Sequence, residues 1–495
     1  MYNKTYIMNR KAKKRALRIR LTVIYGSMVL AVILLVAGTY MVIQGYRFNR
    51  FDGKVEQGGL VQFNSVPTGA DVWLDQTRLA SKTQSKLTVS AGSHDVSMQR
   101  AGYHSWNKAV KVFPGTILWL DYVRLVPTSL SPQLAAPLAG VGSAKVSYDA
   151  KTFAIIQIPA EPVITLVGVD STEPVARQVS LPVTAFTPPA ETETQTFELH
   201  TWAYDNRSVL IKHTYGNQVE WISFNVADGK TANNLTKVLG IDAVDVQYSR
   251  EDTNTLFMLT ATNEVRRTNI NQKTVSGPLL HNVNEFNMYD NDTIVFSSRP
   301  DATTGMRMAG YLTANSATPR AVYQSPAGDS AALHMAINKY IGKNYIAVTH
   351  GGAVMVYAGD LAASDTVNPA PFVQIEKIDA KFPVESIGFS PGQRRFMYAV
   401  GGSQITTYDL DLGLYHQLTL QAPLHQPVNW IDDFHFVTSV GSTLSMYDYD
   451  GTNGHDIMGG AVTGEVSLSQ SGRYFNAITQ VGDTVGESRV RMIID

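Results

Sequence analysis

The chain has 495 residues, of which 44% are hydrophobic and 17% are charged. This composition excludes a disordered acidic protein, a coiled coil and a protein with many membrane spans, but it allows one anchor on a globular body. There is no cysteine, which excludes disulfides, thiolate zinc sites and cysteine nucleophiles. Residues 1–20 hold eight of the 41 basic residues and none of the 42 acidic ones, so the rest of the chain is mildly acidic. A mildly acidic body gives no electrostatic reason to bind nucleic acid.

Residues 21–43 form an uncharged apolar segment, LTVIYGSMVLAVILLVAGTYMVI. As a helix it would measure about 34 Å, enough to cross a hydrocarbon core of about 30 Å. The basic residues before it predict a cytoplasmic stub over residues 1–20 and an extracytoplasmic location for everything after the helix. A cleaved signal peptide is the alternative, but its apolar core is usually about 7–15 residues long. We therefore expect a single-pass protein of the cell membrane, held in the lipid bilayer through residues 21–43, with a linker over residues 44–58.

Residues 59–126 contain short alternating strands separated by Gly, Pro, Asn or Ser, a pattern typical of a small antiparallel β-sandwich. Residues 67–70 form a turn, and Gly92 closes a hairpin. The expected strands read LVQFNSV, ADVWLD, KLTVSA, HDVSMQRAGY, NKAVKVF and ILWLDYVRLV.

Three motifs in this segment resemble those of the PEGA domain, a small sandwich of prokaryotic surface and envelope proteins. They are Pro67-x-Gly69-Ala70-x-Val72, Ala91-Gly92-Ser93-His94-x-Val96 and Gly102-Tyr103-x-x-Trp106. The resemblance covers residues 59–126 and implies a structural and binding module without catalysis. We expect Tyr103 and Trp106 to pack in its core; a ligand platform is the alternative.

Residues 141–495 contain an internal repeat, in which a strand, a polar turn and a second apolar strand recur eight times. The mean spacing is about 46 residues, which is typical of four-stranded propeller blades. Eight starts favour eight blades, while seven remains an alternative because the first gap is long and the last unit is short. The repeats begin at Val146, Trp202, Val246, Phe286, Met335, Ile387, Val428 and Val466.

The repeat is similar to a β-propeller of the Tol-type or WD-like class, and Ser390-Pro391-Gly392 resembles the Ser-Pro-Asp-Gly turn of that class. Because the last unit lacks a fourth strand, we expect a strand from residues 131–140 to complete it and close the ring. Residues 127–140 are predicted to form the joint between the two β domains. The Pro/Thr-rich segment 182–196 is predicted to be an exposed loop inserted in the first blade.

Three short motifs suggest chemistry, and each is better explained by a turn or a loop. Gly388-Phe-Ser390-Pro391-Gly392 fits the nucleophile elbow G-x-S-x-G. In that elbow the residue after the serine donates its N–H to the oxyanion, and proline has none. Gly229-Lys230-Thr231 lacks the first glycine of a phosphate loop, since position 224 is Phe. Leu181-Pro-Val-Thr-Ala185 resembles a sortase signal but lies mid-chain.

Metal sites receive little support. Asp448 and Asp450 begin a run with alternating oxygen ligands, as calcium prefers, but the register departs from that of a calcium loop and turn chemistry selects the same residues. The 11 histidines form no paired zinc motif, and His213, His334 and His435 lie in apolar strand contexts typical of core residues. The sequence therefore names no catalytic, cofactor-binding or metal-binding residue, and no cofactor is predicted.

The sequence favours a non-enzymatic envelope protein in which the propeller binds an envelope protein or a glycan. The fold class is mostly β: one transmembrane helix, a PEGA-like sandwich and a propeller of seven or eight blades. One alternative is a propeller-borne hydrolase or lyase, which predicts converging Asp, Glu, His or Arg side chains at one end of the channel. Another is a membrane signalling protein that acts through the basic stub.

Overall fold

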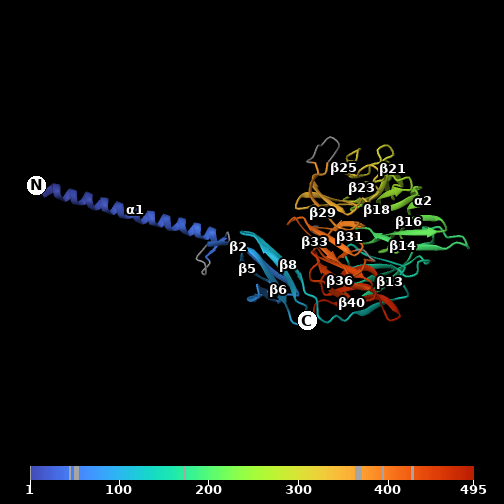
Figure 1. Cartoon of the computed structure of the whole chain (residues 1–495), viewed down its shortest axis with the longest axis horizontal. Coiled ribbons are helices and arrows are strands. Elements are labelled where there is room, and N and C mark those ends of the chain that lie inside the picture. Colours follow the sequence, from blue (N-terminus) through green and yellow to red (C-terminus); the bar gives the residue numbers. More distant parts are fainter. Residues whose placement is uncertain are drawn as a thin grey trace. The chain divides into compact units, whose positions relative to one another are not determined.

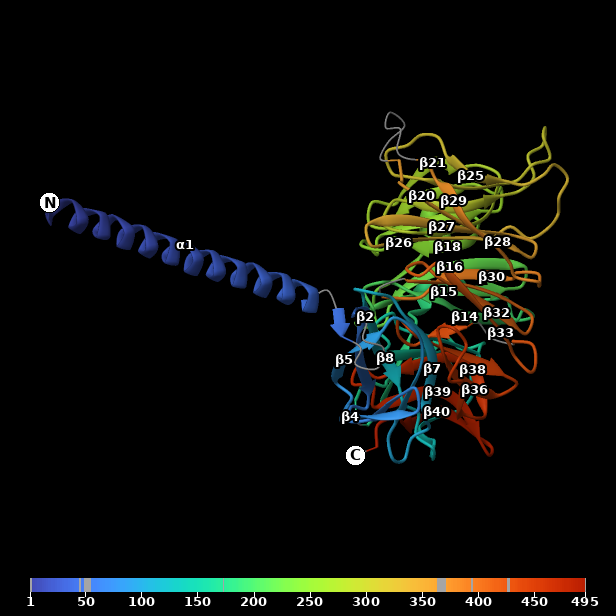
Figure 2. The same ribbon diagram turned by 60° about the vertical axis from the view of Figure 1, so that its left-hand side comes forward.

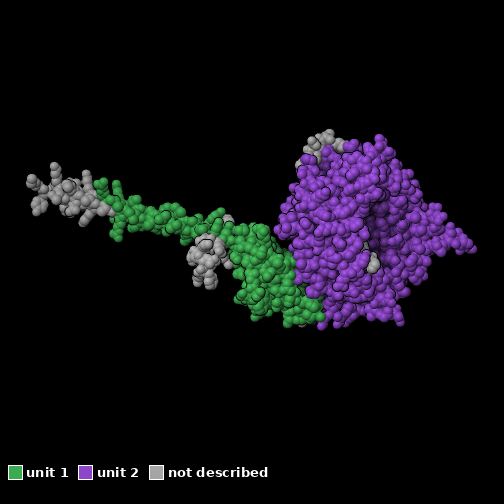
Figure 3. All heavy atoms as spheres, in the orientation of Figure 1, with its two compact units in different colours: residues 1–128 green, residues 129–495 purple. Residues whose placement is uncertain are grey.

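The computed structural model describes residues 2–43, 46–48, 55–171, 173–362, 371–392, 395–424 and 428–494. The chain divides into two compact units, residues 1–128 and residues 129–495 (Figure 3). Parts of the predicted linker, residues 44–45 and 49–54, lie outside the described residues.

The first unit begins with the helix α1 (Tyr2–Ile43), which contains one stretch, Leu17–Val42, that is long and apolar enough to cross a membrane (Figure 1). This stretch includes all of the predicted span 21–43 except Ile43. Its apolar side chains, such as Leu35 and Val42, are exposed within the chain. The basic residues of the predicted stub belong to the same helix, so the stub is helical rather than an irregular tail.

The rest of the first unit is a sandwich of two four-stranded sheets. One sheet joins β1 (Tyr46–Phe48), β2 (Val55–Val66), β5 (Ser85–Ser90) and β8 (Ile117–Arg124). The other has the order β4-β3-β6-β7 and contains β3 (Asp71–Leu74), β4 (Thr77–Lys82), β6 (Gly92–Gln99) and β7 (Trp106–Val112). Alternate residues of both sheets point inward, and Phe63, Met98 and Trp106 are buried between them.

The structure corrects two sequence expectations for this sandwich. Strand β4 was not expected, because the polar residues of TRLASK carry almost no apolar alternation. The sandwich is also not wholly antiparallel, since β8 pairs with β2 in parallel over Leu60–Val66 and Ile117–Arg124. Such a pairing joins distant segments, so local alternation cannot reveal its direction. Tyr103 and Trp106 do lie in the core, as expected.

Eight four-stranded sheets follow one another within the described part of unit 2, which confirms a propeller and selects eight blades over seven. Figures 1 and 2 show these sheets following each other around the unit in chain order. Blades 1 to 4 consist of β10 (Ser143–Val146), β11 (Thr152–Ile156), β12 (Val163–Gly168) and β13 (Val175–Ser180); β14 (Gln195–Trp202), β15 (Ser208–Tyr215), β16 (Gln218–Asn225) and β17 (Ala232–Asn234); β18 (Ala243–Tyr248), β19 (Thr255–Thr260), β20 (Val265–Asn269) and β21 (Thr274–Leu280); and β22 (Val283–Met288), β23 (Ile294–Ser298), β24 (Met308–Leu312) and β25 (Arg320–Gln324).

Blades 5 to 8 repeat the arrangement. They consist of β26 (Met335–Tyr340), β27 (Lys343–His350), β28 (Ala353–Gly359) and β29 (Val373–Asp379); β30 (Ser386–Phe389), β31 (Phe396–Gly401), β32 (Gln404–Asp409) and β33 (Leu414–Thr419); β34 (Asn429–Trp430), β35 (His435–Val440), β36 (Thr443–Asp448) and β37 (His455–Met458); and β38 (Ala461–Leu468), β39 (Tyr474–Val481), β40 (Thr484–Arg491) and β9 (Gln133–Leu138). The short helix α2 (Leu235–Leu239) follows blade 2.

The position of a strand within its blade explains its sequence. Second and third strands such as β19 are buried on both faces, because neighbouring blades cover both faces of the sheet, and they read as continuous apolar runs. The outer strands β13 and β33 are mostly exposed and polar. Between blades 1 and 2, for example, Ile156 and Leu166 share a core with Phe197 and Ile222.

The predicted closing strand is confirmed. Strand β9 pairs antiparallel with β40, so the first strand of unit 2 completes the last blade. Ala136 and Ile478 of blade 8 then share a core with Phe153 and Val167 of blade 1. The ring is thus closed by hydrogen bonds between opposite ends of the propeller sequence.

The Pro/Thr-rich segment differs from its prediction. It connects blades 1 and 2 rather than interrupting blade 1, and its first half is packed. Ala185 and Phe186 are buried, and the Phe186 ring packs edge-on against Phe197. Residues 190–194 are exposed, as expected.

Candidate functional site

The first strands of the blades converge at the centre of unit 2, because β10 contacts both β14 and β38, and β26 contacts β30. A cavity of about 380 Å³ lies between the first strands of blades 1 to 6, and we call it the inner pocket. Figure 3 shows the hollow in the face of unit 2. The pocket is lined by Tyr148, His200, Thr201, Trp202, Tyr204, Gln247, Tyr248, Arg250, Asn287, Met288, Tyr289, Val295, Met335, Ala336, Ile337 and Ile387.

One wall of the pocket is built by equivalent turns of three successive blades. In each turn the residue after the first strand, namely Ser147, Ala203 or Ser249, donates its N–H across the turn to a carbonyl oxygen at the start of the second strand. The next residue in each turn points into the pocket. These residues are Tyr148, Tyr204 and Arg250.

The three side chains form a ladder. The rings of Tyr148 and Tyr204 stack with centroids 4.2 Å apart and planes 10° apart, and the Arg250 guanidinium carbon lies 4.9 Å from the Tyr204 centroid. Stacked aromatic pairs and cation–π contacts are each favourable by about 1 kcal/mol. Tyr148 nevertheless stays 53% exposed, so its ring offers a surface to a ligand.

The sequence repeat alone would predict Tyr248 in this ladder, because Tyr248 aligns with Tyr148 and Tyr204. In the structure, however, Tyr248 is the last residue of β18 and is buried. Its hydroxyl lies 2.7 Å from the Ser223 hydroxyl, and burial raises its pKa. Arg250, two residues later, takes the ladder position because it is the second residue after its first strand, as Tyr148 and Tyr204 are after theirs.

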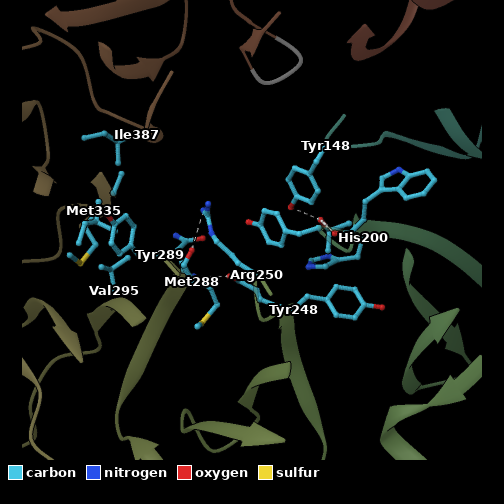
Figure 4. A pocket seen from close by; sticks show the side chains of 16 residues that line it. Tyr148, His200, Tyr248, Arg250, Met288, Tyr289, Val295, Met335 and Ile387 are labelled. Carbon is cyan, nitrogen blue, oxygen red and sulfur yellow. Dashed lines mark hydrogen bonds between the residues drawn. The ribbon is translucent and has the colours of Figure 1, made fainter. Parts of the chain in front are cut away.

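The opposite wall is mostly apolar. Blades 4 to 6 contribute Asn287 and Tyr289 together with the apolar residues Met288, Val295, Met335, Ala336, Ile337 and Ile387. Figure 4 shows Arg250 between Tyr148 on one side of the pocket and Met335 and Ile387 on the other. The inner pocket therefore combines an aromatic and cationic wall with an aliphatic wall.

A hydrogen-bonded pair lies at the start of β18. His200 Nε2 is 3.1 Å from Asp245 Oδ1, and Gln247 donates to the other carboxylate oxygen at 3.2 Å. Burial acts to raise the pKa of Asp245, but the hydrogen bond and the attraction of His200 outweigh it and lower that pKa. Gln247 also donates to the Phe286 carbonyl oxygen at 2.8 Å and accepts from the Met288 N–H at 3.1 Å, so it joins β18 to β22.

The residues of the short motifs that suggested chemistry lie outside the inner pocket. Ser390 is buried, and its hydroxyl accepts the Phe396 N–H within the turn of blade 6. Gly229 has a φ of +65° and sits in the turn after β16. Asp450 accepts hydrogen bonds from the N–H and the hydroxyl of Thr452, which is the turn chemistry expected there.

Two of the three histidines are core residues, as expected. His213 is fully buried and contacts Glu220 at 3.3 Å. His435 is buried with its Nδ1 2.8 Å from Asp432 and its Nε2 3.4 Å from Asp448. Burial acts to lower the pKa of His435, but these two carboxylates outweigh burial and raise it. His334 is only partly buried and pairs with Glu285 at 3.0 Å.

Residues 59–128 match the family model of the PEGA domain, in agreement with the resemblance of the three motifs. No curated protein matches the chain. The C-terminal WD40 domain of Sif2 is similar to this chain in structure, with a TM-score of 0.47 and 12% identity, covering 74% of this chain and 99% of that one.

Two further solved structures are similar to this chain. The β-propeller domain of Myceliophteria thermophila Cps50 (Swd1) has a TM-score of 0.41 and 9% identity, covering 65% of this chain and 97% of that one. A chain of a mitotic checkpoint complex has a TM-score of 0.35 and 11% identity, covering 74% of this chain and 93% of that one. Because these TM-scores are below 0.5, the assignment of a propeller rests on the strand pairing described above. The chain thus carries a PEGA domain over residues 59–128, followed by an eight-bladed β-propeller.

Proposed function

We propose that this protein is a membrane-anchored, non-catalytic binding module of the cell envelope. In this proposal residues 1–20 lie in the cytoplasm, residues 21–43 cross the membrane and residues 44–58 link the helix to the PEGA domain. The PEGA domain and the propeller then lie outside the membrane, where the propeller binds a protein or a glycan.

The observation that carries the proposal is the inner pocket. Its ladder side chains, Tyr148, Tyr204 and Arg250, lie outside the apolar cores between the blades and line a concave surface instead. Tyrosine and arginine dominate the energetics of protein binding sites, because both offer a large contact area together with hydrogen bonds. A pocket of this size and composition is typical of a binding site.

Photo-crosslinking tests the binding role in the full-length protein in its native membrane. We expect p-benzoylphenylalanine in place of Tyr148 to crosslink one discrete partner. The same group in place of Val175, an exposed residue of the outer strand β13, is the matched control. Equal crosslinking patterns at the two positions would contradict a partner at the inner pocket.

Cysteine labelling tests the topology, because the natural chain has no cysteine. Lys14→Cys in α1 and Ser81→Cys in β4 each add one thiol at an exposed position. In cells stripped to the cytoplasmic membrane, an impermeant maleimide should label S81C at once and K14C only after permeabilisation. The reverse order would overturn the proposed orientation.

A hydrolase or lyase is the second candidate, and the His200–Asp245 pair favours it because a histidine oriented by a carboxylate can act as a general base. The wild-type protein would then turn over an envelope glycan or peptide. Loss of this activity in His200→Ala, with the activity retained in Tyr148→Leu, would favour an enzyme. No turnover by the wild-type protein would leave the binding role.

A further inference from the structure

Arg250 stands out in the inner pocket because it is a partly buried cation with no counter-ion in the part of the chain that the structure describes. Its Nη2 donates to the Met288 carbonyl oxygen at a long 3.4 Å, and its buried Nε makes no hydrogen bond to a described residue. Among the described residues, no carboxylate pairs with it. Burying a charge without a partner is unfavourable, so an external anion at this position would be stabilised.

Four acidic residues near the ladder have other partners. Asp245 lies within β18 and pairs with His200. Asp205 accepts from the N–H groups of Arg207 and Ser208. Asp149 and Asp290 hold their own turns in the same way.

The shape of the guanidinium suits a carboxylate. Its planar array of N–H donors matches the two oxygens of a carboxylate, and such charge-assisted hydrogen bonds are stronger than neutral ones. The cation–π contact with Tyr204 restrains the guanidinium, which lowers the entropy lost when a ligand binds.

The wall opposite Arg250 specifies the rest of the ligand. Ile337 and Ile387 are half-buried and line the pocket from blades 5 and 6. We therefore propose that the inner pocket binds a carboxylate carried on an apolar body, with the carboxylate at Arg250 and the apolar body between the aliphatic wall and Tyr148. The C-terminal residue of a peptide and a free branched-chain acid share this chemistry. The proposal deepens the binding role given above and rests on it.

The test uses the full-length protein in lipid nanodiscs and titrates three probes by calorimetry. N-acetyl-leucyl-leucine carries the carboxylate, its C-terminal amide lacks it, and 4-methylpentanoate is a free acid. We expect the peptide acid to bind at least about tenfold more tightly than the amide, since each charge-assisted pair contributes that much or more. Binding of 4-methylpentanoate as well would assign the shared chemistry, whereas binding of the peptide acid alone would assign a peptide C-terminus.

Arg250→Gln tests the proposed contact, and Arg207→Gln is its matched control. Arg207 lies on the neighbouring turn of blade 2, is exposed and does not line the pocket. R250Q should lower the affinity for the peptide acid about tenfold and leave the affinity for the amide unchanged, while R207Q should change neither. If R250Q does not fold, Arg250→Lys keeps the charge, loses the planar array and should give an intermediate loss.

Several outcomes would overturn this inference. Equal affinities for the peptide acid and its amide would mean that Arg250 does not bind a carboxylate. An unchanged affinity of R250Q for the peptide acid would mean the same. Failure of all three probes to bind would also reject it. A discrete crosslinked partner at Tyr148 would still support the binding role in that case, so the two failures are distinguishable.

Discussion

The buried residue Glu487 is expected to make the stability of this propeller depend on pH. Glu487 on β40 has no exposed surface, and neither carboxylate oxygen makes a hydrogen bond to a described residue. Its strand partners Ile478 and Ala136 belong to the core that joins blade 8 to blade 1. Burial raises the pKa of the Glu487 carboxyl to about 7, although the nearby Arg489 acts to lower it.

This raised pKa predicts a loss of stability at alkaline pH. Because the pKa of Glu487 is higher in the folded state than in the unfolded state, its contribution is fully present below about pH 4.5 and is lost as the pH rises through 7. The free energy of unfolding should fall by about 2–3 kcal/mol between pH 5 and pH 8 on account of this residue. The side chain introduced by Glu487→Gln cannot ionise. The free energy of unfolding of this variant, measured by urea denaturation at both pH values, should therefore not show that part of the decrease. Parallel pH profiles of wild type and E487Q would contradict the prediction.

A second residue-scale prediction concerns the pair Arg395–Asp409 in blade 6. Asp409 is buried and accepts two hydrogen bonds from Arg395, at 2.8 and 2.6 Å. Arg395→Met removes the partner of a buried charge and should lower the free energy of unfolding by about 3 kcal/mol. Arg78→Met in the PEGA domain is the control, because the pair Arg78–Asp71 is largely exposed and should contribute little. Similar losses in the two variants would show that burial does not decide the effect.

At the scale of elements, local pattern predicted most of the propeller strands, because each blade repeats an apolar strand, a polar turn and an apolar strand. The turns are fixed by short-range chemistry: Asp205 and Asp290 each accept N–H groups two and three residues ahead. Strand β4 was missed because an exposed edge strand needs no apolar alternation. Its position depends on its partner β3, which its own residues do not specify.

The helix α1 carries the prediction that belongs to this scale. Its apolar stretch Leu17–Val42 is longer than the core of a signal peptide, so we expect it to be retained as an anchor. The intact mass of the protein extracted from membranes should therefore include residues 1–43. A mature mass that lacks these residues, with release of the protein from the membrane, would show that the segment is a signal peptide.

For the molecule as a whole, closure of the ring is the decisive feature of unit 2. The pairing of β9 with β40 joins segments about 350 residues apart in sequence and covers the edge of β40 that would otherwise be open. Closing so long a loop costs conformational entropy, which the core shared by blades 8 and 1 offsets.

Removing the closing strand should therefore open the propeller. Of two fragments, residues 129–495 should give one sharp thermal transition, whereas residues 139–495 should melt at a lower temperature and aggregate through the free edge of β40. Ser129→Gly and Ser131→Gly in the longer fragment alter the segment just before β9 without altering the strand, and should leave the transition unchanged. Equal melting temperatures for the two fragments would mean that β9 does not stabilise the ring.

The sequence by itself determined the apolar span, the PEGA motifs, the propeller repeat and the need for a closing strand. Each of these depends on local periodicity, turn chemistry or a count of strands, and those properties are written along the chain. The tertiary structure alone decided the number of blades, the parallel pairing of β8 with β2 and the composition of the inner pocket. Tyr148, Tyr204 and Arg250 lie about 50 residues apart and meet because the blades curve into a ring. The letters of the repeat align Tyr248 with the other two tyrosines, but Tyr248 ends its strand and is buried, and Arg250, the second residue after that strand, lines the pocket.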